Sequence, residues 1–449
     1  MNLLVDPWIP VENELITLEE LLTSANTYQL AVERDDMEFA TLTMLVSLVQ
    51  ALFTPNDDTE LQELRSHPMD VYRPPHVEWF DLTHPVHPFM QKVAVGVAPS
   101  NPIQKLIMLP GGTESTLFGK AGERKYLTDP ELAIALFCNA VFAPNFTSNI
   151  GGPLDGPGVH TLVHNSCLRR MIWENVLHKG EIRKILPTYG TLECVETPTW
   201  VEQTVDQTFG ENIGLLRGLF YQRIHIQIER EHGAAVSYKA PRVAAKTKGY
   251  WIHPHCPRQK NKKGRHWRKL SLEEKASWQN LHEFVLKGES NIPAPAVERA
   301  TGSVRILVGG FHVKDAKILE TTFITLPLKA GWQNRQLDIA DVVALALSRQ
   351  KCLVDAAKKV FMRLTKKPAL KAEKLYSRRV ETIIYHGFKT VEWDEVEEWV
   401  ERLRKQFNKL SLEVFDEVTE PHMNDARRMK ELLAERRMLA KNLNRVKRQ

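Results

Sequence analysis

The chain has 449 residues, a formal net charge of +5 and 43% hydrophobic residues. This length predicts two or three domains, and the hydrophobic fraction is ordinary for a globular protein with a real core. The slightly basic balance permits nucleic-acid binding without requiring it.

Cysteine usage and hydropathy exclude several further classes. The five cysteines include no CxxC pair, so we expect reduced, mostly buried thiols rather than a disulfide framework or zinc ribbon. Asp6 and Pro7 interrupt a secretory signal, and no apolar run approaches the roughly 20 residues of a membrane span. We therefore expect a cytoplasmic protein without a membrane partner.

The N-terminal elements begin with a short strand over residues 1–11, closed by Pro7 and Pro10. Residues 36–53 are strongly apolar between acidic residues at their start and Pro55 after their end, which predicts a buried helix. Further helices are predicted from Pro130 to Phe142 and from Leu168 to His178.

Loops and strands follow. Residues 99–131 are loop-like, and residues 143–160 are so rich in glycine and proline that a functional loop is predicted. Alternating apolar residues predict strands at 219–228, at Val304–Val308 and at Thr321–Leu326. The last two flank a predicted hairpin tip, Gly309–Lys317.

From about Gln336 the apolar spacing becomes helical, over residues 338–364, 370–386, 392–417 and 421–447. The predicted fold class is α+β. A large mixed α/β N-terminal globular domain, residues 1–335, precedes a C-terminal four-helix bundle, residues 336–449.

Basic charge concentrates in two places. Residues 258–269 hold seven Lys/Arg, no acid and an interleaved Trp267, which favours a loop that tracks phosphates over a merely solubilising one. Its candidate DNA-backbone contacts are Lys260, Lys262, Lys263, Arg265 and Arg268. Residues 421–449 hold nine Lys/Arg against three acids, as an exposed face or as a groove for a DNA strand or acidic partner.

Catalytic and metal motifs are weak. His253 and His255 share a face if extended and precede Cys256, but a zinc or nuclease site needs further ligands and an acidic neighbour. His84 and His87 lie between prolines with no third ligand nearby. The sequence therefore predicts no metal, no cofactor and no catalytic residue.

Several strings together resemble a known family. They are Met1-Asn2-Leu3-Leu4-Val5-Asp6-Pro7-Trp8-Ile9-Pro10, Arg34-Asp35-Asp36-Met37-Glu38-Phe39, His84-Pro85-Val86-His87-Pro88-Phe89-Met90-Gln91, Trp251-Ile252-His253-Pro254-His255, Gly309-Gly310-Phe311 and Gly331-Trp332-Gln333. In this order they are similar to the large subunit, CasA, of the type I-E CRISPR surveillance complex Cascade. The resemblance implies a non-enzymatic subunit that recognises the PAM, a short motif beside the target, through the minor groove of duplex DNA.

The resemblance also implies where DNA is read. The family's glycine-rich loop falls on Thr147, Ser148 and Asn149, where polar side chains replace glycines, and its basic finger falls on Arg242 and Lys246. Its hairpin wedge falls on Lys314, Asp315 and Ala316, where the acidic residue departs from the family pattern. Phe118 and Lys120 match a loop that touches the guide-RNA end and supports PAM binding.

The implied partners are double-stranded target DNA, CRISPR RNA, the backbone, small and guide-end-capping subunits, and a helicase-nuclease or a nuclease on another subunit. Base pairing would read the target while the protein reads its flank. Two alternatives remain open: a metal-dependent nuclease using His253 and His255, and a scaffold that does not read the PAM.

Overall fold

The computed structural model describes residues 1–12, 14–107, 124–142, 153–154, 156, 158–202, 208–241, 247–249, 251–260, 267–270, 277–314, 317–361, 367–423 and 426–445. The chain forms two compact units. The first comprises Met1–Glu274, Gly288–Ala300 and Ile306–Thr325, and the second comprises Lys275–Lys287, Thr301–Arg305 and Leu326–Gln449.

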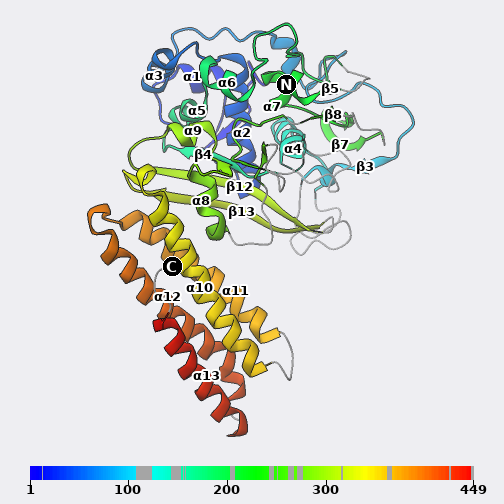
Figure 1. Ribbon diagram of the computed structural model, residues 1–449. Coiled ribbons are helices and arrows are strands. Elements are labelled where there is room, and N and C mark those ends of the chain that lie inside the picture. The colour runs from blue at the N-terminus through cyan, green and yellow to red at the C-terminus, as the bar shows by residue number, and fades with distance from the viewer. Residues whose placement is uncertain are drawn as a thin grey trace. The chain divides into compact units, whose positions relative to one another are not determined.

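The first unit mixes helices with small sheets (Figure 1). Its helices are α1 (Leu18–Thr23), α2 (Asp35–Leu52), α3 (Asp58–Ser66), α4 (Asp129–Val141), α5 (Leu168–Asn175), α6 (Lys179–Ile185), α7 (Leu215–Leu219) and α9 (Pro295–Arg299). Its short strands are β1 (Ile9–Val11), β2 (Glu14–Ile16), β3 (Ser100–Pro102), β4 (His160–His164), β5 (Thr208–Phe209), β6 (Gln227–Glu231), β7 (Ala234–Lys239), β8 (Thr247–Lys248), β9 (Arg258–Lys260), β10 (Trp267–Lys269) and β11 (Asn291–Ile292).

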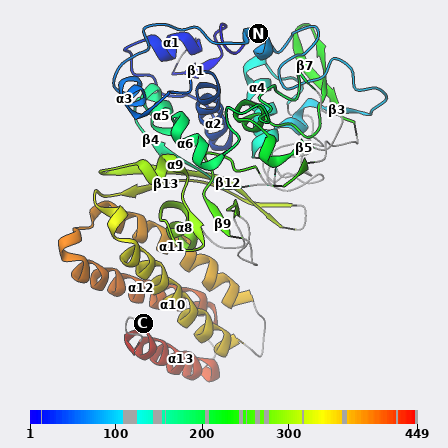
Figure 2. The ribbon, with the colours of Figure 1, turned by 45° about the horizontal axis from the view of Figure 1, so that its top comes forward.

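The strands pair in the orders β1-β2, β10-β9-β11, β13-β12-β4, β3-β7-β6 and β5-β8. Two long strands, β12 (Val304–Lys314) and β13 (Lys317–Leu328), form a hairpin whose arms lie side by side in both ribbon views (Figures 1 and 2). Because β12 is central in its three-stranded sheet, both of its edges are paired.

Helix α2 forms the centre of the first unit, as its apolar sequence predicts, and packs against α4, α5 and α7. A helix buried on all sides must satisfy its polar side chains internally. Thr43 donates to the Phe39 carbonyl (2.9 Å), and the Gln50 amide both donates to and accepts from the backbone of Leu177 (3.0 and 2.6 Å). The two Gln50 bonds tie α2 to the segment that follows α5.

The predicted helix at 130–142 is confirmed as α4, capped by a reciprocal Thr128–Glu131 box. The helix predicted at Leu168–His178 is confirmed as α5, which ends three residues earlier, at Asn175. Two other local predictions were wrong. Pro10 lies inside β1 rather than closing it, and the strand predicted at 219–228 begins only at Gln227. Leu219 instead ends a short helix. The alternating apolar residues between Leu219 and Gln227 are buried in an irregular segment.

The sequence predicted a hairpin tip over Gly309–Lys317, but the strand continues past Gly309, and the packing of this glycine explains the difference. A β-carbon added to Gly309 would lie 2.4 Å from the Phe39 ring, so this glycine permits close packing of β12 on α2. Gly309 and Gly310 therefore continue the strand, which reaches Lys314, and only residues 315–316 separate the two arms.

The second unit contains four long helices that run alongside one another (Figure 2): α10 (Gln336–Phe361), α11 (Lys367–Thr390), α12 (Val396–Thr419) and α13 (Ala426–Arg445). The short helix α8 (Leu281–Val285) packs on α10. The predicted α+β fold class with a C-terminal helical region is confirmed, because the apolar spacing of each helix buries one face. Every helix among the described residues is too short or too polar to span a membrane.

Buried polar contacts join these long helices. Arg349 on α10 is 1% exposed and contacts Asn408 on α12 (3.2 Å) and the Leu443 carbonyl on α13 (3.4 Å). Burial lowers the pKa of its guanidinium, which is nevertheless held by several acceptors. Asp416 and Arg436 add a bidentate pair between α12 and α13 (2.6 and 2.7 Å).

We predict that Gly309→Ala lowers the free energy of unfolding by about 1–3 kcal/mol, because the added methyl group must displace the Phe39 ring or the strand. Chemical denaturation measures this change. In a Phe39→Leu background the same substitution should cost less, since the obstructing ring is gone. Equal costs in the two backgrounds would contradict the contact.

Candidate nucleic-acid interface

Most residues predicted to contact nucleic acid lie outside the described part of the structure. They are Phe118, Lys120, Thr147, Ser148, Asn149, Arg242, Lys246, Lys262, Lys263, Arg265, Asp315 and Ala316. The backbone of Lys314 is described as the last residue of β12, and Lys260 and Arg268 lie in β9 and β10. The candidate interface is therefore built from the described residues that flank these segments.

Aromatic rings anchor the hairpin within a few residues of its tip, at Phe311 and Phe323, which we call the base of the candidate wedge. Phe323 on β13 packs against Phe39 on α2, with ring centroids 5.6 Å apart, and against Phe311 on β12, at 5.9 Å. Phe311 is 5% exposed and precedes Lys314 by three residues. The candidate wedge thus extends from a fixed, buried base.

The same Phe39 ring contacts Phe142, which precedes the candidate glycine-loop segment in sequence. Phe142 directly follows α4 and makes an edge-on contact with Phe39, with centroids 5.7 Å apart. Thr147 follows Phe142 by five residues in sequence. One ring on α2 therefore holds both the hairpin base and the point where the loop segment leaves the helix.

The segment after the candidate finger is anchored separately. Arg242 and Lys246 precede β8, which pairs in parallel with β5 through Thr247 and Thr208. Farther along the chain, Trp251 is buried and donates from its indole nitrogen to the Ile213 carbonyl (3.1 Å). A β-carbon at Gly218 would lie 2.1 Å from the Trp251 ring, so this glycine accommodates the tryptophan.

Histidine rings connect these anchors into one series, the aromatic series Phe39–Phe142–His160–His253–Trp251. Successive centroid separations after the first are 4.3, 4.5 and 5.4 Å. The series runs from α2 through the start of β4 to the segment following β8. Residues near three sequence-predicted DNA-contact segments therefore share one packed core, although sequence reasoning identified none of these ring contacts.

The histidines of this series are neutral at pH 7. Burial, followed by the positive charge of Lys269, lowers the pKa of His160 well below its ordinary value, and burial does the same for His253. Burial also lowers the pKa of the neighbouring His255 to about 3. His253 and His255 are only 4% and 1% exposed, which does not suit a nuclease centre that must admit nucleic acid and water.

The basic strands β9 and β10 pair antiparallel, and their register separates two predicted contacts. Lys260 lies opposite Trp267, whereas Arg268 lies opposite Gln259. Because cross-strand partners share a face and consecutive residues alternate, Lys260 and Arg268 occupy opposite faces of the sheet. The predicted DNA-backbone contacts of Lys260 and Arg268 therefore lie on different faces, and both stay predictions.

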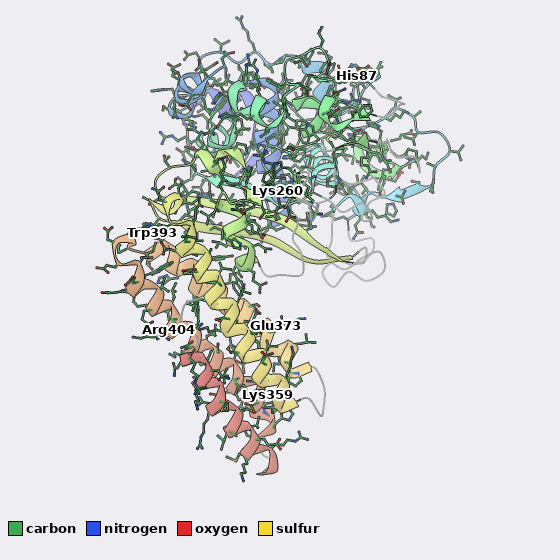
Figure 3. The ribbon with its side chains drawn as sticks, viewed as in Figure 1. His87, Lys260, Lys359, Glu373, Trp393 and Arg404 are labelled. Carbon is green, nitrogen blue, oxygen red and sulfur yellow. The ribbon has the colours of Figure 1, made fainter. Side chains whose placement is uncertain are left out.

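Lys260 is the better placed of the two for a phosphate. It is exposed (labelled in Figure 3), and its ammonium nitrogen lies 5.4 Å from the centroid of the Trp267 ring. Arg258 and Lys269, at the other end of the ladder, share the face of Lys260 but are more buried than it is. Burial lowers the pKa of Arg258, and Lys269 donates to the Leu154 carbonyl (2.5 Å).

The basic C-terminal helix divides into two faces. Leu432, Leu439 and Leu443 are buried, while Arg437, Lys441 and Arg445 are exposed at four-residue intervals. Because such spacing places side chains on one helix face, these three cations form an exposed basic stripe. Arg436 is instead paired with Asp416.

A family model for the CRISPR-associated protein Cse1 matches residues 2–439. The chain belongs to the Cse1 family. This membership confirms the resemblance seen in the opening strings and covers both units.

Solved structures of Cse1 proteins have the same fold at low sequence identity. Thermus thermophilus CasA (Cse1) gives a TM-score of 0.77 at 17% identity and 99% coverage of both chains. Thermobifida fusca Cse1 gives 0.72 at 16% identity, covering 99% of this chain and 98% of that one. A chain of a CRISPR RNA-guided surveillance complex gives 0.67 at 15% identity, covering 98% and 99%.

We predict that Lys260→Gln weakens binding to nonspecific duplex DNA and lowers the magnitude of the salt slope, log K against log salt, by about one, because one phosphate contact is lost. Arg268→Gln should leave that slope unchanged, since Arg268 faces the other way. Binding titrations over a salt series measure both.

The exposed Lys184 on α6 supplies a matched control, and Lys184→Gln should behave as the unaltered protein. Equal reductions for Lys260→Gln and Arg268→Gln, or none for either, would contradict the assignment of one face.

Proposed function

We propose that this Cse1 family member is the large subunit of an RNA-guided type I-E complex that recognises the PAM in double-stranded DNA. In this role it reads the minor groove, helps open the duplex for invasion by the guide RNA, and supports recruitment of an effector nuclease in antiviral defence. The observation that carries the proposal is the match of the Cse1 family model to residues 2–439. Likeness to a chain of an RNA-guided surveillance complex over 98% of this protein adds support.

The proposed reading site combines the loop, finger and hairpin. Its residues are Thr147, Ser148, Asn149, Arg242, Lys246, Lys314, Asp315 and Ala316, with Phe118 and Lys120 in support. The aromatic series favours this grouping, because Phe39 contacts both Phe142 before the loop and Phe323 in the hairpin. A wedge that separates base pairs must resist the strain of unstacking, and a base packed on α2 gives it that resistance.

The polar loop residues give the proposal its chemical detail. Minor-groove reading is degenerate, because A·T and T·A pairs present the same acceptors there. Threonine, serine and asparagine side chains add donors that glycine lacks, so this chain should prefer a different set of motifs from a glycine-loop relative. Lys314 would add a cation attracted by the negative potential of the groove.

The proposed partners are target DNA, CRISPR RNA, the other Cascade subunits and a helicase-nuclease or a nuclease on another subunit, all in the cytoplasm. We assign no catalytic residue and no cleavage step to this chain. A nuclease centre at His253 and His255 is the less favoured alternative, because both rings are buried among other aromatic residues.

The proposal is tested by binding of the reconstituted complex, with and without this subunit, to duplexes carrying a randomised PAM. Binding should depend on both the PAM and the subunit. Asn149→Ala should change the ranking of motifs, and Lys314→Ala should reduce affinity for all of them by roughly tenfold, the scale of one close charged contact.

Lys329→Ala serves as the matched control for Lys314, because Lys329 follows β13 and pairs with Glu392 in the second unit. It should leave the motif ranking intact. Binding that ignores both the PAM and the two substitutions would overturn the assigned site and leave a scaffold that does not read DNA.

A further inference from the structure

Three buried side chains with metal-ligating atoms meet within the aromatic series. One ligand atom each from His160, His253 and Cys256 lies within 4.8 Å of the other two. His160 begins β4, whereas the other two lie some ninety residues later, so only the fold brings them together. All three side chains are buried.

Three of the four histidine ring nitrogens in this cluster complete no hydrogen bond with the described residues. Neither ring nitrogen of His160 completes a hydrogen bond, although the Val141 backbone lies near enough to favour its protonated form slightly. The Nε2 atom of His253 is likewise unpaired. Buried polar atoms are nearly always paired in native proteins, so these nitrogens call for a partner that the described protein atoms do not supply.

The donor atoms of the cluster are of kinds that bind a cation. An imidazole nitrogen offers a lone pair to a metal, and a cysteine sulfur binds a metal as its thiolate. A bound divalent metal would displace the Cys256 thiol proton, and one thiolate would leave a net charge of +1 at the site, beside the positive charge of Lys269.

We propose that His160, His253 and Cys256 bind a structural transition-metal ion, with Zn²⁺ as the preferred species. Imidazole nitrogen combined with thiolate sulfur is a donor set typical of zinc. Zinc holds such donors at about 2.0–2.3 Å, so the cluster must contract by roughly 1 Å to close around it. The His255 ring, centred 5.3 Å from that of His253, is a further candidate for a fourth ligand, although it is not one of the three residues whose ligand atoms converge.

Metal binding has one local cost. The Nδ1 atom of His253 accepts a hydrogen bond from the His255 backbone N–H at 3.2 Å. A metal on Nε2 requires the ring proton to move to Nδ1, which breaks this bond. The bond is long and spans only two residues, so the gain of a metal partner for three buried groups outweighs it.

The ion would lock β4 to the segment after β8. That segment already bonds to β4 through Thr161 N–H and the His255 carbonyl (2.8 Å), and Val159 N–H bonds to Leu270 (2.9 Å). A metal would add a covalent-strength link at the same place. The site is structural in kind, because its burial leaves no approach for a substrate.

The test is metal analysis of the untagged full chain after gel filtration, by mass spectrometry of the elements. We expect about one zinc per chain, the stoichiometry of a single closed site. Cys256→Ser and His160→Gln should each lower zinc affinity by more than about tenfold. Cys138→Ser, which removes another buried thiol on α4, should leave the zinc content unchanged.

Cobalt substitution keeps the test decisive if the variants fail to fold. Cobalt bound through Cys256 in the unaltered chain should produce thiolate charge-transfer absorption in the near ultraviolet, and chelator should abolish it and lower the melting temperature. A chain that takes up neither zinc nor cobalt on reconstitution would overturn the proposal. So would metal content that persists undiminished in both ligand variants, because that result would place the ion elsewhere.

Discussion

The approach of Phe39 to Gly309 is the contact on which the arrangement of the first unit depends. A β-carbon at Gly309 would stand 2.4 Å from the ring, so α2 and β12 touch only because one residue lacks a side chain. The same ring then contacts Phe142 and Phe323. Helix, hairpin and the end of α4 are therefore fixed relative to one another by one aromatic side chain in a tightly packed interior.

The aromatic series continues the packing around Phe39 into rings that carry polar nitrogen atoms. From Phe142 it continues through His160 and His253 to Trp251, so imidazoles replace hydrocarbon rings where the core meets the segment after β8. Phenylalanine fills such space without any polar demand, whereas each buried imidazole must find partners for its nitrogens. The proposed metal ion would give the buried imidazole nitrogens a partner. The proposed DNA-reading segments lie close to the same rings in sequence.

Sequence reasoning reached the elements whose signal is local. Helix α2, helix α4 and the four long helices follow from apolar spacing and caps, and family membership follows from the opening strings. It failed where a long-range contact decides the outcome. Glycine is common in turns, so the sequence predicted a turn at Gly309, whereas the structure places Gly309 in a strand against Phe39. His160 and His253 are about ninety residues apart in sequence, so their ring contact could not be predicted from local patterns. The opposite facing of Lys260 and Arg268 likewise required the strand register.

The length of the hairpin arms sets both the position of the tip and the side to which its residues point. Each strand residue adds about 3.4 Å of length and turns the following side chain to the other face. Beyond the base fixed at Phe311, lengthening both arms by one residue would carry the tip farther out but reverse the side that its first residue presents. A change of one residue per arm therefore alters both the length of the hairpin and the side to which its tip residue points. A change of two residues per arm, about 7 Å, alters the length alone.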